Sequence, residues 1–159
     1  MRILVDADAC PVKEIIIKVA GEMDIPVVMV MDTSHDWQCE GVKVITIDKA
    51  RDGVDIALIN LARKGDVVVT QDYGVAAMAL GKGLRALNQN GLIFLPANMD
   101  KLLFERHLGQ KIRRGGGRTK NQKKRTQTDD ERFEKALRHV LGEVLKDQRE
   151  VASDVDPSL

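Results

Sequence analysis

Short aliphatic runs alternate with helical patterns over the first 95 residues of the chain. Each run is rich in β-branched residues and shows little polar alternation, which is typical of strands that are buried on both faces of a parallel sheet. The runs predict five strands, at residues 3–5, 27–31, 42–47, 67–70 and 92–95. We therefore expect an α/β domain built on a mainly parallel sheet.

Helices are predicted between these strands. Pro11 stands where the first helix would open, at a position that tolerates proline. A second helix is predicted from about residue 52 to residue 62, and a third is predicted to follow Tyr73. The tight-turn signal Asn90-Gly91 separates residues 85–88 from the last strand. This turn predicts an antiparallel edge on the otherwise parallel sheet.

The last third of the chain has a different pattern. Asn98 is predicted to cap a further helix, and a basic stretch with three consecutive glycines follows, which cannot form a core element. Thr128 and Glu131 match a capping box, and the helix that they start has a strong apolar stripe. This stripe is expected to pack on the main domain or to form a homodimer. The predicted organisation is an α/β domain, a basic flexible segment, an amphipathic helix and a frayed tail, at residues 1–110, 111–127, 128–148 and 149–159.

Charge is distributed unevenly along the chain, although the net charge is only +1. Residues 111–127 hold eight Lys and Arg and no acidic residue, whereas residues 1–110 carry a net charge of −3. A basic block inside a slightly acidic chain favours a polyanionic partner such as nucleic acid. The candidate phosphate-binding residues are Lys13, Arg113, Arg114, Arg118, Lys120, Lys123, Lys124 and Arg125.

Targeting signals are not found in the sequence. No apolar run approaches the roughly 18–20 residues that a membrane span needs. The start of the chain lacks the pattern of a signal peptide. Cys10 and Cys39 are too few for a disulfide framework or a zinc site. We expect a soluble cytoplasmic protein with reduced thiols and no membrane contact.

Acidic residues recur where the predicted strands end and a helix starts. Asp6 and Asp8 end the first strand and point to the same side. Asp52 and Asp55 are three residues apart at a helix start, and Asp72 follows a later strand. The carboxyl ends of parallel strands share one rim, so these five carboxylates are expected to converge there. Hard oxygen ligands favour Mg²⁺ or Mn²⁺.

Each of these aspartates also has a purely structural interpretation. An aspartate after a strand is commonly a helix cap or a turn residue. Asp52 and Asp55 could favour the positive end of a helix dipole. Three other aspartates are less distinctive, and turn or surface roles are expected for Asp32, Asp36 and Asp48.

Four motifs resemble the YaiI/YqxD family of small bacterial proteins: Asp-Ala-Asp-Ala-Cys-Pro-Val-Lys (6–13), Asp-Gly-Val-Asp (52–55), Gly-Asp-Val-Val-Val-Thr-Gln-Asp-Tyr-Gly (65–74) and Arg-Arg-Gly-Gly-Gly-Arg-Thr-Lys (113–120). That family is related to the PIN-like nucleases. The resemblance implies a three-layer α/β/α fold and a metal-dependent nuclease acting on RNA rather than DNA. It implies catalytic roles for Asp6, Asp55 and Asp72. The basic segment and the C-terminal helix depart from the basic PIN fold, and so does the lack of a Glu among the middle acids.

Two other functions remain open. The chain could be a nucleic-acid-binding module whose acidic site is vestigial. It could also be a phosphatase of the haloacid dehalogenase type, with Asp6 as the nucleophile and Asp8 as the general acid. That phosphatase motif expects Thr where Cys10 stands.

Overall fold

Six strands and five helices are present in the computed structural model, which describes residues 1–32, 37–48, 53–116 and 123–154. The strands are β1 Ile3–Asp6, β2 Val27–Asp32, β3 Lys43–Ile47, β4 Val67–Val69, β5 Arg85–Leu87 and β6 Ile93–Phe94. The helices are α1 Lys13–Met23, α2 Val54–Leu61, α3 Tyr73–Gly81, α4 Pro96–Arg114 and α5 Gln127–Ser153.

All six strands form one sheet in the order β3-β2-β1-β4-β5-β6. Neighbouring strands are parallel except β5 and β6, which are antiparallel. The turn before β6 contains Gly91 with a φ of 83°, a left-handed conformation that glycine adopts without strain. The predicted parallel sheet with an antiparallel edge is therefore confirmed.

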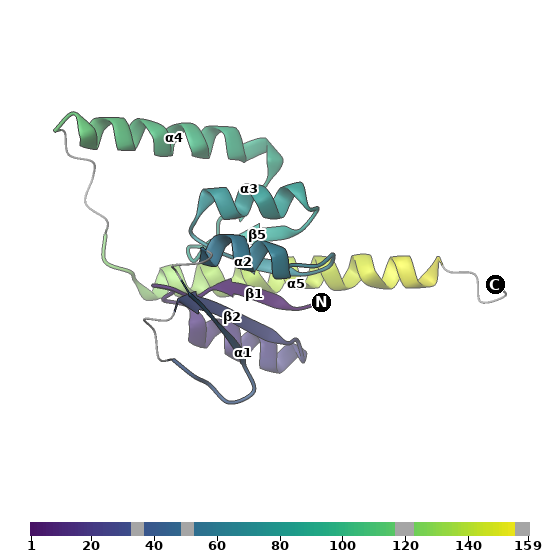
Figure 1. The fold of residues 1–159 in the computed structure, drawn as a ribbon. Coiled ribbons are helices and arrows are strands. Elements are labelled where there is room, and N and C mark those ends of the chain that lie inside the picture. Colours follow the sequence, from purple (N-terminus) through teal and green to yellow (C-terminus); the bar gives the residue numbers. More distant parts are fainter. Residues whose placement is uncertain (33–36, 49–52, 117–122, 155–159) are drawn as a thin grey trace.

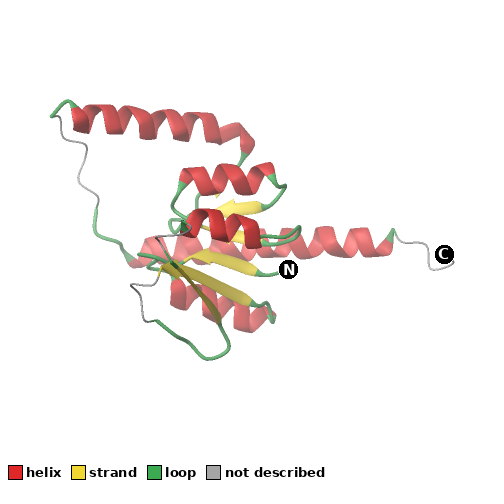
Figure 2. Cartoon of the chain, viewed as in Figure 1, coloured by secondary structure: helices red, strands yellow, loops and turns green. Residues whose placement is uncertain are grey.

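Helices cover both faces of the sheet (Figures 1 and 2). In β1, Ile3 and Val5 contribute to one core, together with α1 and α5. Leu4 points to the opposite side and joins the core that α2 and α3 cover. All three residues are completely buried, which explains why the sequence of this central strand shows no polar alternation. The fold is thus a three-layer α/β/α sandwich.

The C-terminal helix α5 packs on the sheet of its own chain. Its apolar stripe lies in the same core as α1, and the buried residues are Phe133, Leu137, Val140, Leu141 and Val144. Two ion pairs link α5 to α1, Lys18 with Glu134 at 3.1 Å and Arg138 with Glu22 at 2.6 Å. The homodimer that the sequence allowed through this helix stays a prediction.

The ends of α5 differ from those predicted. Thr126 is the N-cap, and it exchanges hydrogen bonds with Asp129. The capping box therefore begins two residues before the predicted pair, Thr128 and Glu131. The helix also continues to Ser153, so the first part of the predicted tail is helical.

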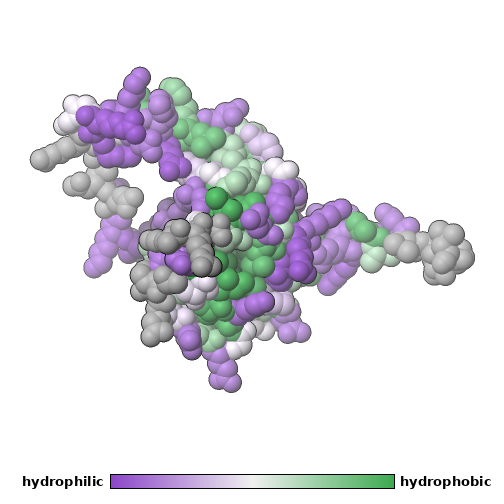
Figure 3. All heavy atoms as spheres, viewed as in Figure 1, coloured by the Kyte–Doolittle hydropathy of each residue, from purple (hydrophilic) through white to green (hydrophobic). Residues whose placement is uncertain are grey.

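Helix α4 is longer than the sequence indicated. It begins at Pro96, so Asn98 lies in the first turn, where its side chain accepts a hydrogen bond from the backbone N–H of Leu95 at 2.9 Å. The helix ends at Arg114, which places the predicted domain boundary at residue 110 inside it. The far end of α4 stands clear of the body, and hydrophilic side chains cover it (Figure 3). Within the described residues, no helix is both long and apolar enough to span a membrane.

Candidate functional site

The two central strands β1 and β4 mark a change in the direction of the fold. From β1 the chain continues to β2 on one side, whereas from β4 it continues to β5 on the other side. In open α/β sheets, ligands bind at such a topological switch point, outside the carboxyl ends of the strands. Asp6 is the last residue of β1, and Asp72 follows β4 directly before α3.

A buried hydroxyl connects the ends of these two strands. The Thr70 Oγ1 accepts a hydrogen bond from the backbone N–H of Asp72 at 3.0 Å and donates one to Asp6 Oδ2 at 3.1 Å. The loops are also joined by Gln71, whose Nε2 donates to the carbonyl of Ala9 at 3.2 Å. Thr70 is only 2% exposed. It was not among the predicted site residues, although it lies two residues before Asp72.

Three other acids act on Asp6. Burial is the main cause that raises the pKa of Asp6 from 3.8 to about 6. The hydrogen bond from Thr70 lowers this pKa, and the negative charges of Asp8, Asp72 and Asp55 raise it, in that order of size. The charges of three of the other predicted ligands are therefore close enough to the end of β1 to act on Asp6. The fifth predicted ligand, Asp52, lies outside the described residues.

Asp72 also caps a helix, which is the structural role expected of an aspartate that follows a strand. Its Oδ1 caps α3 by accepting hydrogen bonds from the backbone N–H of Gly74 at 2.7 Å and of Val75 at 3.2 Å. The Nη1 of Arg106, on α4, lies 3.9 Å from the same oxygen. Capping and a role in the acidic site are compatible, because the cap uses one of the two carboxylate oxygens.

Asp8 and Asp32 meet at the same rim. Asp8 Oδ1 accepts a hydrogen bond from the backbone N–H of Asp32 at 3.4 Å. Asp32 ends β2 and is only 2% exposed, so the predicted turn or surface role is wrong for this residue. Burial on both faces of the sheet extends to the last residue of β2. Asp48 is exposed as predicted, and Asp36 lies outside the described residues.

The oxygen atoms at this rim are of the kind that binds a hard divalent cation. Carboxylate oxygens, with the hydroxyl of Thr70 beside them, are the ligands that Mg²⁺ and Mn²⁺ prefer. Among the described residues, however, no three His, Cys, Asp or Glu side chains are already arranged to hold a metal ion. Mutual repulsion favours separated carboxylates until a cation lies between them. Binding of such a cation would therefore require these side chains to move closer together.

The predicted phosphate-binding residues lie in different settings. Lys13 is the first residue of α1, and its Nζ lies 5.7 Å from the ring centroid of Trp37. Arg113 and Arg114 form the exposed last turn of α4, which shows that the predicted flexible segment begins as a helix. Lys123 and Lys124 are exposed before α5. The structure does not describe the remaining two of the glycine-rich stretch, Arg118 and Lys120.

Arg125 is tied into the protein itself. Its Nε donates to Asp130 at 2.5 Å, its Nη1 to Asn90 at 3.0 Å, and its Nη2 to the carbonyl of Gln89 at 2.7 Å. The guanidinium thus links the start of α5 to the turn before β6. These contacts explain the residue without a nucleic-acid ligand.

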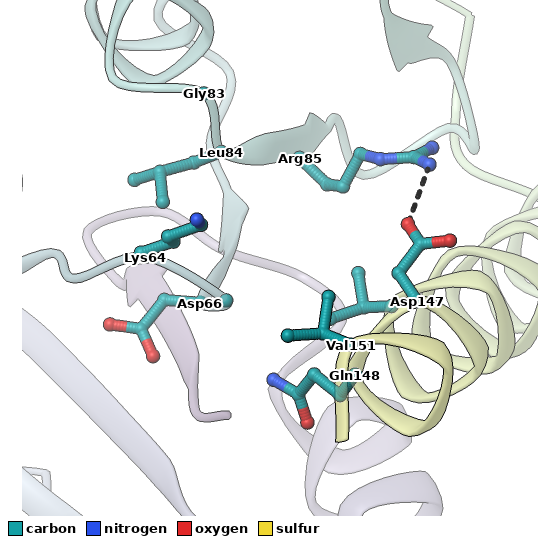
Figure 4. A pocket seen from close by; sticks show the side chains of 10 residues that line it. Lys64, Asp66, Gly83, Leu84, Arg85, Asp147, Gln148 and Val151 are labelled. Carbon is teal, nitrogen blue, oxygen red and sulfur yellow. Dashed lines mark ion pairs between the residues drawn. The ribbon is translucent and has the colours of Figure 1, made fainter. Parts of the chain in front are cut away.

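A separate cavity of about 430 Å³ lies at the other end of the strands, next to their amino ends (Figure 4). It is lined by the loop before β4, the start of β5 and the far part of α5. Arg85 and Asp147 form an ion pair of 3.8 Å at its rim. The cavity is therefore separate from Asp6 and Asp72, which lie at the carboxyl ends of the strands.

Comparisons with known proteins agree with the resemblance. A family model described as "Uncharacterized BCR, YaiI/YqxD family" matches residues 4–143. A UPF0178 protein of Ruminiclostridium cellulolyticum is 66% identical over 137 residues, covering 86% of this chain and 90% of that protein. A UPF0178 protein of Alkaliphilus oremlandii is 51% identical over 147 residues, covering 92% of this chain and 95% of that protein.

Among solved structures, the chain is similar to Rae1 (YacP) from Bacillus subtilis, with a TM-score of 0.45 and 16% identity. The match covers 91% of this chain and 98% of that one. At this distance the similarity assigns no activity.

Proposed function

The chain belongs to the YaiI/YqxD family, and from this premise we propose that it is a nuclease that hydrolyses phosphodiester bonds of RNA with the help of Mg²⁺ or Mn²⁺. The observation that supports this most is that Thr70 joins the Asp6 carboxylate to the backbone of Asp72 at the ends of β1 and β4. The negative charges of Asp8, Asp72 and Asp55 also act on Asp6 and raise its pKa. A concentration of negative charge at a switch point is unfavourable for the protein alone, and a bound cation would offset it.

Each residue of the site has a distinct task in this proposal. Asp6, Asp55 and Asp72 would hold the cation, and Asp8 and Asp52 would orient the water around it. A bound divalent cation polarises the phosphodiester and makes a bound water more acidic. Thr70 would fix the Asp6 carboxylate through its hydrogen bond at 3.1 Å. The exposed cations Arg113, Arg114, Lys123 and Lys124 would bind the RNA backbone without reading its sequence.

The test is cleavage of end-labelled single-stranded and hairpin RNAs by the purified protein, with Mg²⁺ or Mn²⁺ and with EDTA. We expect cleavage that requires the cation and that Asp6→Asn abolishes. Asp147→Asn is the matched control, because it removes the same charge near the amino ends of the strands, away from Asp6. Intact RNA in every cation-containing reaction of the folded wild-type protein would contradict the proposal.

A second candidate is a nucleic-acid-binding module without catalysis. It is favoured by the lack of a preformed set of three metal-binding side chains in the part of the chain that the structure describes. In this case RNA binding would be salt-sensitive, no RNA would be cleaved, and Asp72→Asn would leave the affinity unchanged.

A further inference from the structure

Helix α4 extends beyond the rest of the fold on the side of the acidic rim. It runs from α3 toward the side of the molecule where β1 ends, and none of the other described helices lies beside its far half (Figure 1). Met99 is buried, Leu102 and Gln110 are half-buried, and the other long side chains of the helix are exposed. A helix held at only one end can present its remaining length to a ligand.

One face of α4 changes from apolar to cationic along its length. Met99, Leu102, Arg106, Gly109 and Arg113 are spaced three and four residues apart and therefore share a face. The first two pack on the core under α2 and α3. The later positions continue this inner face past the end of the core.

The two arginines of the inner face lie along it. Arg106 reaches the rim, where its Nη1 is 3.9 Å from Asp72 Oδ1. The Nη1 of Arg113 is 3.6 Å from the position that a Cβ on Gly109 would occupy, so this guanidinium folds back over the glycine. Seven residues of helix separate the two arginines by about 10 Å along the axis. They can therefore contact different phosphates.

The outer face of α4 has a different character. Phe104, Leu108 and Ile112 form an exposed apolar stripe there. Lys101 lies on this outer side, is 79% exposed and pairs with Glu105 at 3.8 Å. It has the same charge as Arg106 but does not approach the carboxylates, which makes it a matched control.

We propose that the backbone of single-stranded RNA lies between the inner face of α4 and the carboxylate rim, with Arg106 and Arg113 each binding one phosphate. The proposal rests on the nuclease function above and assigns its substrate path. A guanidinium binds a phosphate with two parallel hydrogen bonds, better than it binds a distant carboxylate. The ion pair between Arg106 and Asp72 is long and half exposed, so it is weak. It keeps Arg106 near the rim and leaves its guanidinium able to bind a phosphate.

Fluorescence anisotropy of a labelled 12-nucleotide oligouridylate, titrated at several KCl concentrations without divalent cations, tests this path. Each phosphate contact on a single strand contributes about 0.7 to the slope of log affinity against log salt. We expect Arg106→Gln and Arg113→Gln each to reduce the slope by about that amount. Lys101→Gln should leave it unchanged, and Arg106→Lys should retain the slope because it keeps the charge. Equal thermal unfolding midpoints would show that the variants are folded.

Unchanged slopes for Arg106→Gln and Arg113→Gln, or a wild-type protein that does not bind the oligonucleotide, would overturn the proposed path. The nuclease function fails in a different way. In that case the wild-type protein would bind the oligonucleotide through α4 and still cleave no RNA in the presence of Mg²⁺ or Mn²⁺.

Discussion

The hydroxyl of Thr70 donates a hydrogen bond to the carboxylate of Asp6 at 3.1 Å and joins the ends of the two central strands. Thr70 is buried, and the same oxygen also accepts from the backbone N–H of Asp72. One side chain therefore serves both the fold and the acidic site.

Replacing Thr70 with Val keeps the shape of the side chain and removes the hydroxyl. The Asp72 N–H and the Asp6 carboxylate then each lose a partner, which costs about 1–3 kcal/mol of unfolding free energy. Urea denaturation measures this change. Thr46→Val on the exposed face of β3 is the control and should change stability by less than about 0.5 kcal/mol. Equal urea midpoints for Thr70→Val and Thr46→Val would show that the hydrogen bonds of the Thr70 hydroxyl do not stabilise the protein.

Asp6 should make the stability of the protein depend on pH. Its pKa is about 6 in the folded protein and 3.8 as the ordinary value, so ionisation opposes folding. The cost develops as the pH rises from about 4 to about 6 and is complete above that range. Asp6→Asn removes the charge, and its Oδ1 can still accept from Thr70. This variant should gain about 1–3 kcal/mol over the wild-type protein at pH 7.5 without divalent cations, and almost nothing at pH 4.

Thermal or urea unfolding across this pH range checks the prediction for Asp6. Asp147→Asn is again the control, since its side chain is 65% exposed. If Asp6→Asn were less stable than the wild-type protein at pH 7.5, the ionised Asp6 would not destabilise the folded protein, and the prediction would be wrong.

Arg125 is expected to act on stability rather than on RNA binding. Arg125→Gln removes hydrogen bonds to Asp130, Asn90 and the Gln89 carbonyl, and should cost about 1–2 kcal/mol. Lys124→Gln removes a neighbouring exposed charge and should leave stability within about 0.5 kcal/mol. Unfolding curves of the two variants give the comparison. A destabilised Lys124→Gln with an unaffected Arg125→Gln would contradict this assignment.

The sheet could be predicted well from the sequence because its signals are local. Buried parallel strands are continuous aliphatic runs, such as Val67–Val69, and a tight antiparallel turn needs a residue such as Gly91. The helix ends were less predictable. Two overlapping capping patterns precede α5, and the sequence favoured the one with Glu131, whereas the structure uses Thr126 with Asp129.

The acidic site was predictable as far as it depends on strand ends. Asp6 and Asp72 follow aliphatic runs, and the parallel sheet places such residues at one rim. Thr70 and Arg106 could not be predicted in the same way. The role of Thr70 depends on the register of β1 and β4, and that of Arg106 on how α4 packs against α3.

Calorimetric titration of Mn²⁺ into the wild-type protein, Asp6→Asn and Asp147→Asn at pH 7.5 tests the central claim most directly. We predict saturable binding to the wild-type protein and to Asp147→Asn, and binding at least about tenfold weaker for Asp6→Asn. If the folded wild-type protein took up no Mn²⁺, or if Asp6→Asn bound it equally well, the carboxylates at the switch point would not form a metal site.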